Sequence, residues 1–292
     1  MARKTISDIA ALLNITLEGN LIAPAMLAKV ERLDADGQSE ADYAVKPGLT
    51  IRDEIPRAFR IGQALFSQFA GSDTTTAGAT LRFVTQILTD VFGFSDLQAG
   101  GRRQSDGRDY LVHLEAGDGR IPIIVIPPKD TIDRASEALA FDERKRSAST
   151  ALQDWLNAED DALWGLATNG DVIRLMRDNA SLTRPAFVEA DLKQIFETED
   201  YSSFSALWLL LHRSRFGDKP APVTDCALER WRDTGSKEGA VVRDRLRDGV
   251  EDALRVFGSG FLEANPDLRK RLSEGDLKLT VFFNELLRII YR

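Results

Sequence analysis

An acid and a lysine flank two neighbouring apolar runs near the middle of the chain. Asp109 opens a run in which apolar and polar residues alternate, and Lys129 follows the apolar run at 123–126. A carboxylate that opens one strand and a lysine that follows the next are residue types of a divalent-metal site that activates water. A hard divalent ion needs more than one oxygen ligand, and Pro127, two residues before the lysine, offers no side-chain oxygen. The sequence therefore predicts a degenerate metal site.

Two alternatives stay open at this position. A neighbouring acid could supply the missing carboxylate and leave a magnesium-dependent site active; the candidates are Asp130, Glu115 and Asp118. Alternatively, Asp109 only begins a strand and Lys129 is a solvated loop residue. Pro127 and Pro128 also remove two backbone donors and end the strand. We therefore expect the inactive form.

Helical and strand periodicities alternate around this pair of residues. Apolar residues at helical spacing predict helices at 54–69, 77–91 and 143–156. Alternating or continuous apolar runs predict strands at 109–114, 121–126, 163–168, 172–176 and 186–189, with 121–126 buried on both faces and 186–189 at a sheet edge. The glycine- and arginine-rich segment 100–107 is expected to be a loop, and Asn169-Gly170 a type I′ turn with positive φ at both residues.

The order helix, hairpin, buried strand, helix, strand resembles the core of PD-(D/E)xK nucleases. The resemblance implies an α/β (α+β) fold with a mixed sheet, in which Asp109 is the first acid and Lys129 the lysine. It also places Gln153, on the helix after the buried strand, against the DNA backbone, although an amphipathic helix with Gln153 in water explains the pattern equally well. We expect three parts: an N-terminal helical segment (1–76), the nuclease-like domain (77–190) and a helical connector (191–292).

Several strings resemble one family, the large adenine-specific DNA methyltransferases of type IIG restriction–modification systems and of the DISARM class of phage defence. The strings are Trp155–Ala158, Leu163–Gly170, Ile173–Asp178, Asn179–Ala186, Glu189–Leu192, Leu207–Phe216 and Phe283–Arg292. The resemblance covers most of residues 105–292, and Leu182-Thr183-Arg184-Pro185 is among its most specific parts. It implies an N-terminal module that works with DNA and with a methyltransferase domain or other defence-system subunits.

The motifs that methylate are missing from the chain. An Asn-Pro-Pro-Tyr-type motif for a flipped adenine does not occur, nor does a glycine-rich turn between a strand and a helix for S-adenosylmethionine. The pair in Phe257-Gly258-Ser259-Gly260 follows a helix and is expected to be a helix end. We therefore expect no methylation by this chain and no cofactor in it. S-adenosylmethionine would belong to a downstream methylase domain, and magnesium only to an active nuclease.

The charge balance limits how the chain could contact DNA. Its formal net charge is −8, whereas most DNA affinity comes from cations that displace counterions from phosphates. A local patch is therefore needed, and Arg102, Arg103 and Arg108 supply the first candidate, unless they are only a solvated loop. The run Arg144–Arg146, expected at a helix start, is the second. The acidic balance also favours a third function, a protein–protein scaffold without DNA contact.

Other residue types exclude several classes of protein. A single cysteine, Cys226, cannot form an internal disulfide and fits a reducing cytoplasm. Charges interrupt the longer apolar stretches, so we expect no membrane span. The two histidines, His113 on a strand and His212 on a helix, lie far apart in sequence and predict no zinc site.

The last helix is expected to be more than a simple amphipathic one. Its apolar residues are Leu279, Phe282, Phe283, Leu286, Ile289 and Ile290. This stripe is broad, and it stops without a glycine cap or a proline, as if the helix continued. We expect it to pack on the preceding helices, with an outer edge that docks a methylase part or a second copy of the chain.

Overall fold

The computed structural model describes residues 12–71, 76–105, 107–141, 144–179 and 185–290. Its contacts divide the chain into two units, 1–235 and 236–292, which are described separately here. The boundaries expected after residues 76 and 190 fall inside the first unit, and the three-part division stays a prediction. The string Leu182-Thr183-Arg184-Pro185 lies almost entirely outside the described residues.

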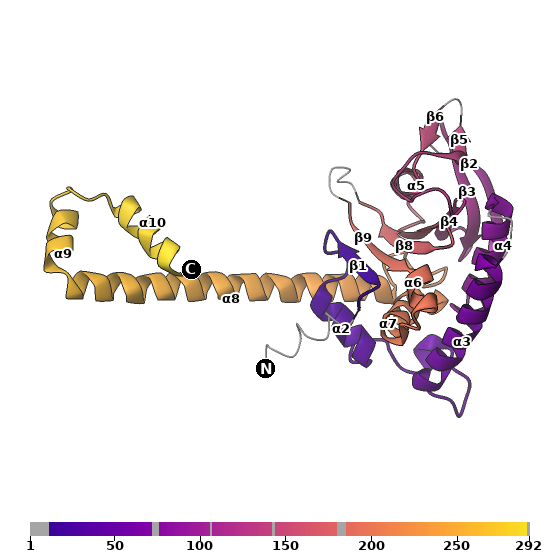
Figure 1. Ribbon diagram of the computed structural model, residues 1–292, viewed down its shortest axis with the longest axis horizontal. Helices are drawn as coiled ribbons and strands as arrows, with labels where there is room; N and C mark the ends of the chain where they lie inside the picture. The colour runs from indigo at the N-terminus through magenta and orange to yellow at the C-terminus, as the bar shows by residue number, and fades with distance from the viewer. Residues whose placement is uncertain (1–11, 72–75, 106, 142–143, 180–184, 291–292) are drawn as a thin grey trace. The chain divides into compact units, whose positions relative to one another are not determined.

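The first unit is built around a mixed sheet of seven strands (Figure 1). In spatial order the strands are β1 (Ile15–Glu18), β9 (Phe187–Asp191), β8 (Val172–Arg177), β7 (Trp164–Thr168), β4 (Ile121–Val125), β3 (Arg108–Ala116) and β2 (Gln98–Ser105). Neighbours are antiparallel except β4 and β7, which are parallel and therefore need a crossover between them. The predicted α/β fold with a mixed sheet is confirmed at this level.

Helices cover both faces of the sheet. On one face a large apolar core includes residues of α2 (Pro24–Arg32), α3 (Ile51–Ala70), α4 (Ala77–Asp90), α6 (Leu192–Glu197) and α7 (Tyr201–Leu211). On the other face, α5 (Ala148–Leu156) packs over a smaller core. Ile123 of β4 belongs to the first core and Ile124 to the second, so β4 is buried on both faces as predicted.

The glycine-rich segment 100–107 was wrongly expected to be a loop. Residues up to Ser105 form β2, which pairs with β3 from Gln98–Glu115 to Ser105–Arg108. A Cβ on Gly100 would lie 2.3 Å from the carbonyl oxygen of Val112, so the close approach of the two strands explains a glycine there. The alternation of apolar and polar residues did not predict β2, because glycine has no apolar side chain to contribute to such a pattern.

The helix expected from residue 143 begins later, at Ala148. Ser147 caps it by accepting a hydrogen bond from the Thr150 amide at 3.1 Å. The basic run Arg144–Arg146 forms a short strand, β6, that pairs with β5 (Ser136–Phe141). These cations are therefore not at the start of a helix.

Two details of the remaining strands were also wrong. β9 is not an edge strand, because the short β1 pairs with its free side. The turn after β7 is not type I′: Gly170 has a φ of 90°, but Asn169 is not among the residues with positive φ. Its Oδ1 instead accepts hydrogen bonds from the amides of Asp171 (3.1 Å) and Val172 (2.8 Å). A side chain thus replaces part of the backbone pattern of a hairpin.

The second unit is helical. It consists of the part of α8 (Ala227–Ala264) from residue 236 onward, α9 (Pro266–Ser273) and α10 (Leu279–Ile290). Phe282 and Leu286 of α10 are buried, and a Cβ on Gly258 of α8 would lie 3.3 Å from a methyl carbon of Leu286. The expected packing of the last helix on the preceding one is therefore present. Within the described residues, no helix is long and apolar enough to cross a membrane.

Candidate functional site

The predicted acid and lysine do not line a common cavity. β3 and β4 pair from Ala116–Ile121 to Leu114–Ile123, and just beyond this ladder the Val125 amide donates to Nδ1 of His113 (3.2 Å) instead. Asp109 lines a small cavity with Arg146 and with residues of β5 and α5, and Lys129 does not line it. Lys129 is exposed in the loop after β4.

The acids that could replace the missing carboxylate are engaged elsewhere. Both carboxylate oxygens of Glu115 accept hydrogen bonds from Arg103 (2.5 and 2.6 Å), and Asp130 accepts one from the Ser136 hydroxyl (2.5 Å). Asp118 lies in the turn between β3 and β4, at the far end of β3 from Asp109. In the described part of the chain, no three His, Cys, Asp or Glu side chains are grouped closely enough to hold a metal ion. Asp109 is the one acid among the described residues that line its cavity.

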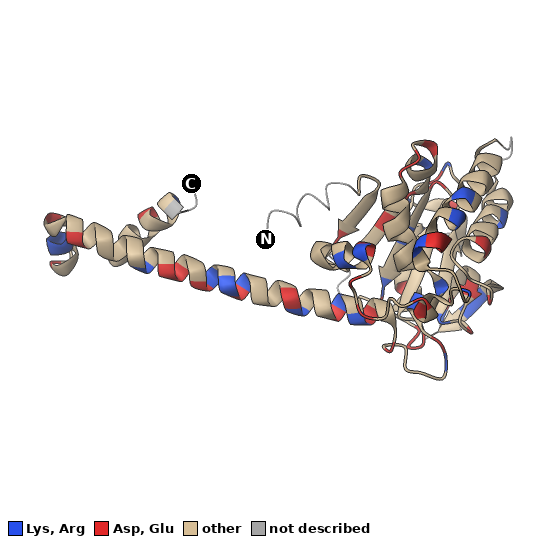
Figure 2. Ribbon diagram, turned by 90° about the horizontal axis from the view of Figure 1, so that it is seen from below, with Lys and Arg blue, Asp and Glu red and all other residues tan. Residues whose placement is uncertain are grey.

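Four residues were predicted to contact DNA: Arg102, Arg103, Arg108 and Gln153. Arg103 is held by Glu115, and Nε2 of Gln153 donates to the carbonyl oxygen of Arg177 (3.3 Å), which ties α5 to β8. Arg102 and Arg108 are exposed on the β2–β3 hairpin. Basic and acidic residues are interspersed along the ribbon in Figure 2. Any DNA contact predicted for this unit therefore rests on the hairpin.

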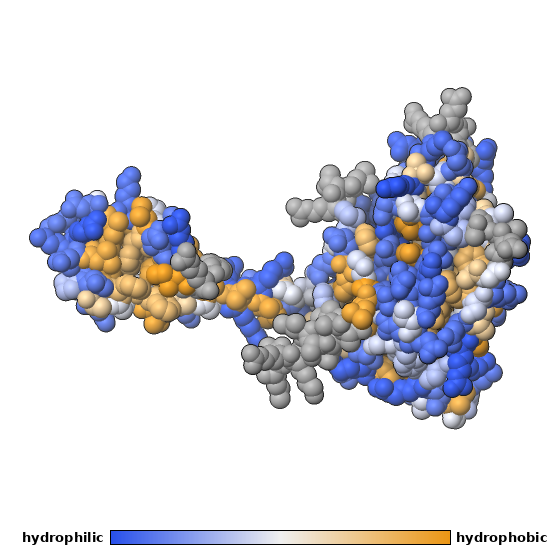
Figure 3. Space-filling model, viewed as in Figure 1, coloured by the Kyte–Doolittle hydropathy of each residue, from blue (hydrophilic) through white to orange (hydrophobic). Residues whose placement is uncertain are grey.

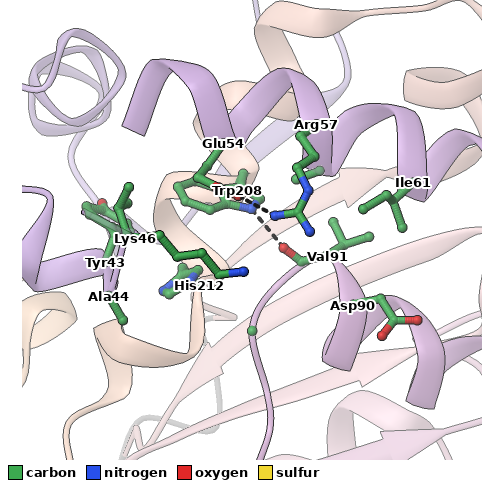
Figure 4. Close-up of a pocket in the computed structure, with 13 residues that line it drawn as sticks. Tyr43, Ala44, Lys46, Glu54, Arg57, Ile61, Asp90, Val91, Trp208 and His212 are labelled. Atoms are coloured by element: carbon green, nitrogen blue, oxygen red, sulfur yellow. Dashed lines mark hydrogen bonds and ion pairs between the residues drawn. The ribbon is translucent and has the colours of Figure 1, made fainter. Parts of the chain in front are cut away.

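A cavity of about 200 Å³ lies on the other side of the unit's fold, where four segments meet (Figure 4). The segments are the loop after the 3₁₀ turn Ala41–Tyr43, the middle of α3, the end of α4 with the residues after it, and the end of α7. Its lining residues are Tyr43, Ala44, Val45, Lys46, Glu54, Arg57, Ala58, Ile61, Asp90, Val91, Gly93, Trp208 and His212. Because these residues span most of the unit, only the folded chain creates the cavity.

Aromatic rings form the fixed floor of this cavity. Tyr43 and Trp208 stack with their ring centroids 5.4 Å apart, and both side chains are buried. The Trp208 indole donates to the carbonyl oxygen of Val91 (2.8 Å), and the Tyr43 hydroxyl donates to that of Leu209 (3.1 Å). Burial raises the pKa of Tyr43 to about 12. The floor is therefore rigid, apolar and uncharged.

A relay of hydrogen bonds fixes the proton position on His212. Arg215 donates to the Ser214 hydroxyl oxygen (3.2 Å), and that hydroxyl lies 2.7 Å from Nδ1 of His212. The Ser214 amide also points at Nδ1 (3.4 Å), so Nδ1 accepts and the ring proton sits on Nε2. Burial, helped by Arg215 and Arg213, lowers the pKa of His212 to about 4. At neutral pH His212 is thus an uncharged ring that presents an N–H.

Two buried arginines hold the segments around His212 in place. Arg213 binds Asp96 (2.6 Å) and Asp218 (2.7 Å). Arg215 lies over the Tyr43 ring, 3.9 Å from its centroid, and donates to the carbonyl oxygens of Gly37 and Asp42. Removing such an arginine would leave buried acceptors without a hydrogen-bond partner, which lowers stability. Arg213 thus attaches the end of α7 to the segment after α4, and Arg215 attaches it to the segment that carries Tyr43.

Charged side chains surround the mouth of the cavity. Arg57 binds Glu54 within α3 (2.9 Å). Lys46 and Asp90 are exposed and form no ion pair with any residue that the structure describes. The sequence did not indicate this site, because its residues are far apart in the chain and His212 was considered only as a zinc ligand. One feature of the sequence could have indicated it: the polar run His212-Arg213-Ser214-Arg215 follows directly after an apolar helix.

No protein-family model, curated protein or solved structure matches the chain. The resemblance to adenine-specific methyltransferases therefore stays a prediction.

Proposed function

We propose that this chain is a DNA-associated module, built on a nuclease-like core that does not cleave, which serves an adenine-specific methyltransferase or its defence complex. The single observation that carries the proposal is the order α4–β2–β3–β4–α5–β7 with β4 and β7 parallel. This is the order of helix, hairpin, buried strand, helix and strand that the nuclease resemblance implies. The hairpin β5–β6, inserted between β4 and α5, is an addition to that order.

The absence of cleavage follows from the residues at the end of β4. Pro127 replaces the second acid, and Asp109 shares its cavity with the cation Arg146 rather than with Lys129. A single carboxylate binds a hard divalent cation weakly, because such ions prefer several oxygen ligands. The core would therefore retain the shape of a nuclease without its metal.

DNA contact would come from the β2–β3 hairpin, on which the side chains of Arg102 and Arg108 are exposed. Phosphate contacts of this kind position a protein on DNA without reading its sequence. A chain with net charge −8 would bind weakly alone, and basic surface from other subunits would add to the hairpin.

A salt series tests the DNA contact. Fluorescence anisotropy on a labelled duplex should give an affinity that falls as salt rises, with a logarithmic slope of about 0.9 per phosphate contacted. The double variant Arg102→Ala/Arg108→Ala should lower that slope by about two such contacts. Arg60→Ala/Arg82→Ala, which removes the same charge from exposed positions on α3 and α4, is the matched control. Equal loss in both variants would mean that the hairpin is not the contact.

Incubation of supercoiled plasmid with Mg²⁺ or Mn²⁺ tests the inactive core. We expect no nicking. Nicking that is abolished by Asp109→Ala would instead support the alternative, an active endonuclease with a displaced acid. Pro127→Glu, which restores the acid, is expected to remain inactive, because β3 and β4 do not bring Asp109 and Lys129 into one cavity.

The second unit favours a second function, assembly with another protein. Several large apolar residues of α8 are more than half exposed, among them Val242 (64%), Leu246 (67%) and Val256 (72%). Figure 3 shows apolar side chains gathered on the visible face of this unit. Exposed apolar surface of this kind marks protein contacts. A protein–protein role is compatible with the DNA proposal, and the last prediction of the Discussion tests it.

A further inference from the structure

We propose that the cavity in Figure 4 binds a small organic carboxylate with an apolar body, held by Lys46, His212 and Arg57. The proposal does not depend on DNA binding or on the methyltransferase resemblance. It rests on hydrogen-bond donors in the lining that have N–H groups available, on the apolar wall beside them and on the size of the cavity.

The donors belong to three different segments and line one cavity. Lys46 has no ion-pair partner in the described part of the chain, and no described residue accepts a hydrogen bond from Nε2 of His212. Nη1 of Arg57 is bound to Glu54, which leaves its other nitrogens available. In Figure 4 the cationic ends of Lys46 and Arg57 point into the space between them. An ammonium, a guanidinium and a neutral N–H suit a carboxylate, which accepts hydrogen bonds at two oxygens.

The wall next to these donors is apolar. Ala58 and Ile61 of α3 line the cavity together with Val91, and so do the buried rings of Tyr43 and Trp208. Sites for drug-sized ligands usually have about 300–1,000 Å³. A cavity of about 200 Å³ therefore fits a smaller molecule, with one polar head and a ring or branched alkyl body.

The acidic residues at the mouth of the cavity favour a ligand with one negative charge over a ligand with two. Glu54 and Asp90 balance Lys46 and Arg57, so the lining carries no net charge. A phosphate dianion would add two negative charges to a lining that already holds Glu54 and Asp90, whereas a carboxylate monoanion adds one, which Lys46 and His212 would hold. Two similar charges are costly to bring together where solvent is partly excluded. The cavity therefore favours a monoanion over phosphate.

A cationic ligand is the main competing chemistry, because Asp90 is unpaired and the C-terminal ends of α4 and α7 meet at the cavity. Helix C-termini favour cations. Lys46 and Arg57 already supply positive charge at this place, and the Nε2 proton of His212 would point at a cation rather than accept from it. The donors outnumber the free acceptors, which is why the carboxylate is preferred.

Titration of the full chain with benzoate, followed by amide chemical shifts and calorimetry, tests the proposal. Benzyl alcohol, benzylamine and inorganic phosphate are the comparison probes. Benzoate should bind more tightly than all three and should shift amides at 43–46, 57–61, 91–93 and 212. Tighter binding of benzylamine or phosphate would overturn the carboxylate assignment, and shifts confined to other segments would overturn the site.

Variants separate a specific head-group contact from apolar binding. Lys46→Met keeps the length of an exposed side chain and should weaken benzoate about tenfold, the usual effect of one charge-assisted hydrogen bond, with no change for benzyl alcohol. Arg60→Met, one turn along α3 from Arg57 and outside the lining, is the matched control and should bind as the original chain does. Equal affinities for benzoate in all three proteins would show that the cavity does not recognise the head group.

A pair of short peptides identifies the source of the carboxylate. The peptides end in leucine, one with a free C-terminal carboxylate and one amidated. If only the free peptide competes with benzoate, the natural occupant is a protein C-terminus. If neither competes, the occupant is a free small acid, and the proposal stands in that form. Competition by both peptides equally would contradict recognition through a carboxylate.

Discussion

At the scale of single residues, the burial of His212 makes stability depend on pH. An unfolded histidine has a pKa near 6.5, whereas burial and the two neighbouring arginines lower the pKa of His212 to about 4. Between these values the unfolded chain binds a proton that the folded chain does not. Stability therefore falls as the pH drops through this window and gains nothing from this residue above about pH 6.5.

The prediction uses His212→Gln, which keeps a neutral polar group beside Ser214. Between pH 6.5 and 4, the free energy of unfolding of the original chain should fall more steeply than that of the variant. The difference should be up to about 1.4 kcal/mol per pH unit, the effect of one proton. Urea unfolding at several pH values measures both slopes. Lys46→Met, which leaves His212 in place, should keep the original slope; parallel slopes for His212→Gln and the original chain would mean that His212 does not titrate abnormally.

The residues predicted to do chemistry show what spacing can reveal. Asp109 and Lys129 flank neighbouring strands as the pattern indicates, but their side chains do not line one cavity. Just beyond the β3–β4 ladder, the Val125 amide donates a hydrogen bond to the His113 ring. Periodicity could not predict this side-chain partner. Gln153 was placed toward DNA or solvent, and it instead bonds the backbone of β8. Sequence separation shows which strand carries a residue, whereas side-chain partners depend on the packing of other segments.

At the scale of elements, the approach of β2 to β3 depends on one of two adjacent glycines. A Cβ on Gly100 would meet the backbone of Val112 at 2.3 Å, while a Cβ on Gly101 would meet nothing within 4 Å. Backbone cannot move aside as easily as the end of a side chain. Gly100→Ala should therefore lower the free energy of unfolding by about 1–3 kcal/mol, as overpacking does.

Gly101→Ala is the matched control in the same strand. It should leave stability unchanged or raise it by up to about 1 kcal/mol, because alanine lowers the entropy of the unfolded chain. Urea unfolding compares the two variants, and the hairpin arginines make salt-dependent DNA binding a second readout. If both alanines had the same effect, the segment would be a loop, as its composition first indicated.

Elements with a strong apolar period were predictable and those without one were not. The helices α3 and α4, the strands β3, β4, β7 and β8, and the turn between β3 and β4 were located within a few residues, because each buries an apolar stripe or run. The strands β1, β2, β5 and β6 were missed. They are short, exposed, or rich in glycine and arginine, and they are held by backbone pairing with a neighbour that the local sequence does not specify.

At the scale of the whole molecule, the buried cores lie almost entirely in the first unit. Their members extend from Leu12 to Trp231, and the buried apolar residues beyond are Phe282 and Leu286. A chain ending at Gly235 should therefore fold cooperatively, with a melting temperature within about 4 °C of the full chain, which corresponds to a loss of roughly 1 kcal/mol or less. Calorimetry measures it; failure to fold would show that 236–292 stabilises the sheet unit.

In the second unit, by contrast, most of the large apolar residues that the structure describes are exposed. Leu246 and Phe257 lie about three turns apart on one face of α8. They are 67% and 47% exposed, whereas α10 packs near Gly258. Burying a side chain of this size stabilises a protein by roughly 1.5–3 kcal/mol, so a partner that covers this face would gain several such contributions.

The last prediction concerns that face. Leu246→Glu/Phe257→Glu should abolish association with the proposed methyltransferase partner or with a second copy, because a carboxylate in an apolar contact would lose its water. The control Ser236→Glu/Ser259→Glu adds the same charge to exposed positions of α8 outside the stripe and should associate normally. Sedimentation over a concentration series measures self-association. Hydrogen exchange at 241–261 and 279–290 should slow in the full assembly and not in the Leu246/Phe257 variant; equally fast exchange in the isolated chain and the assembly would exclude this face as a docking surface.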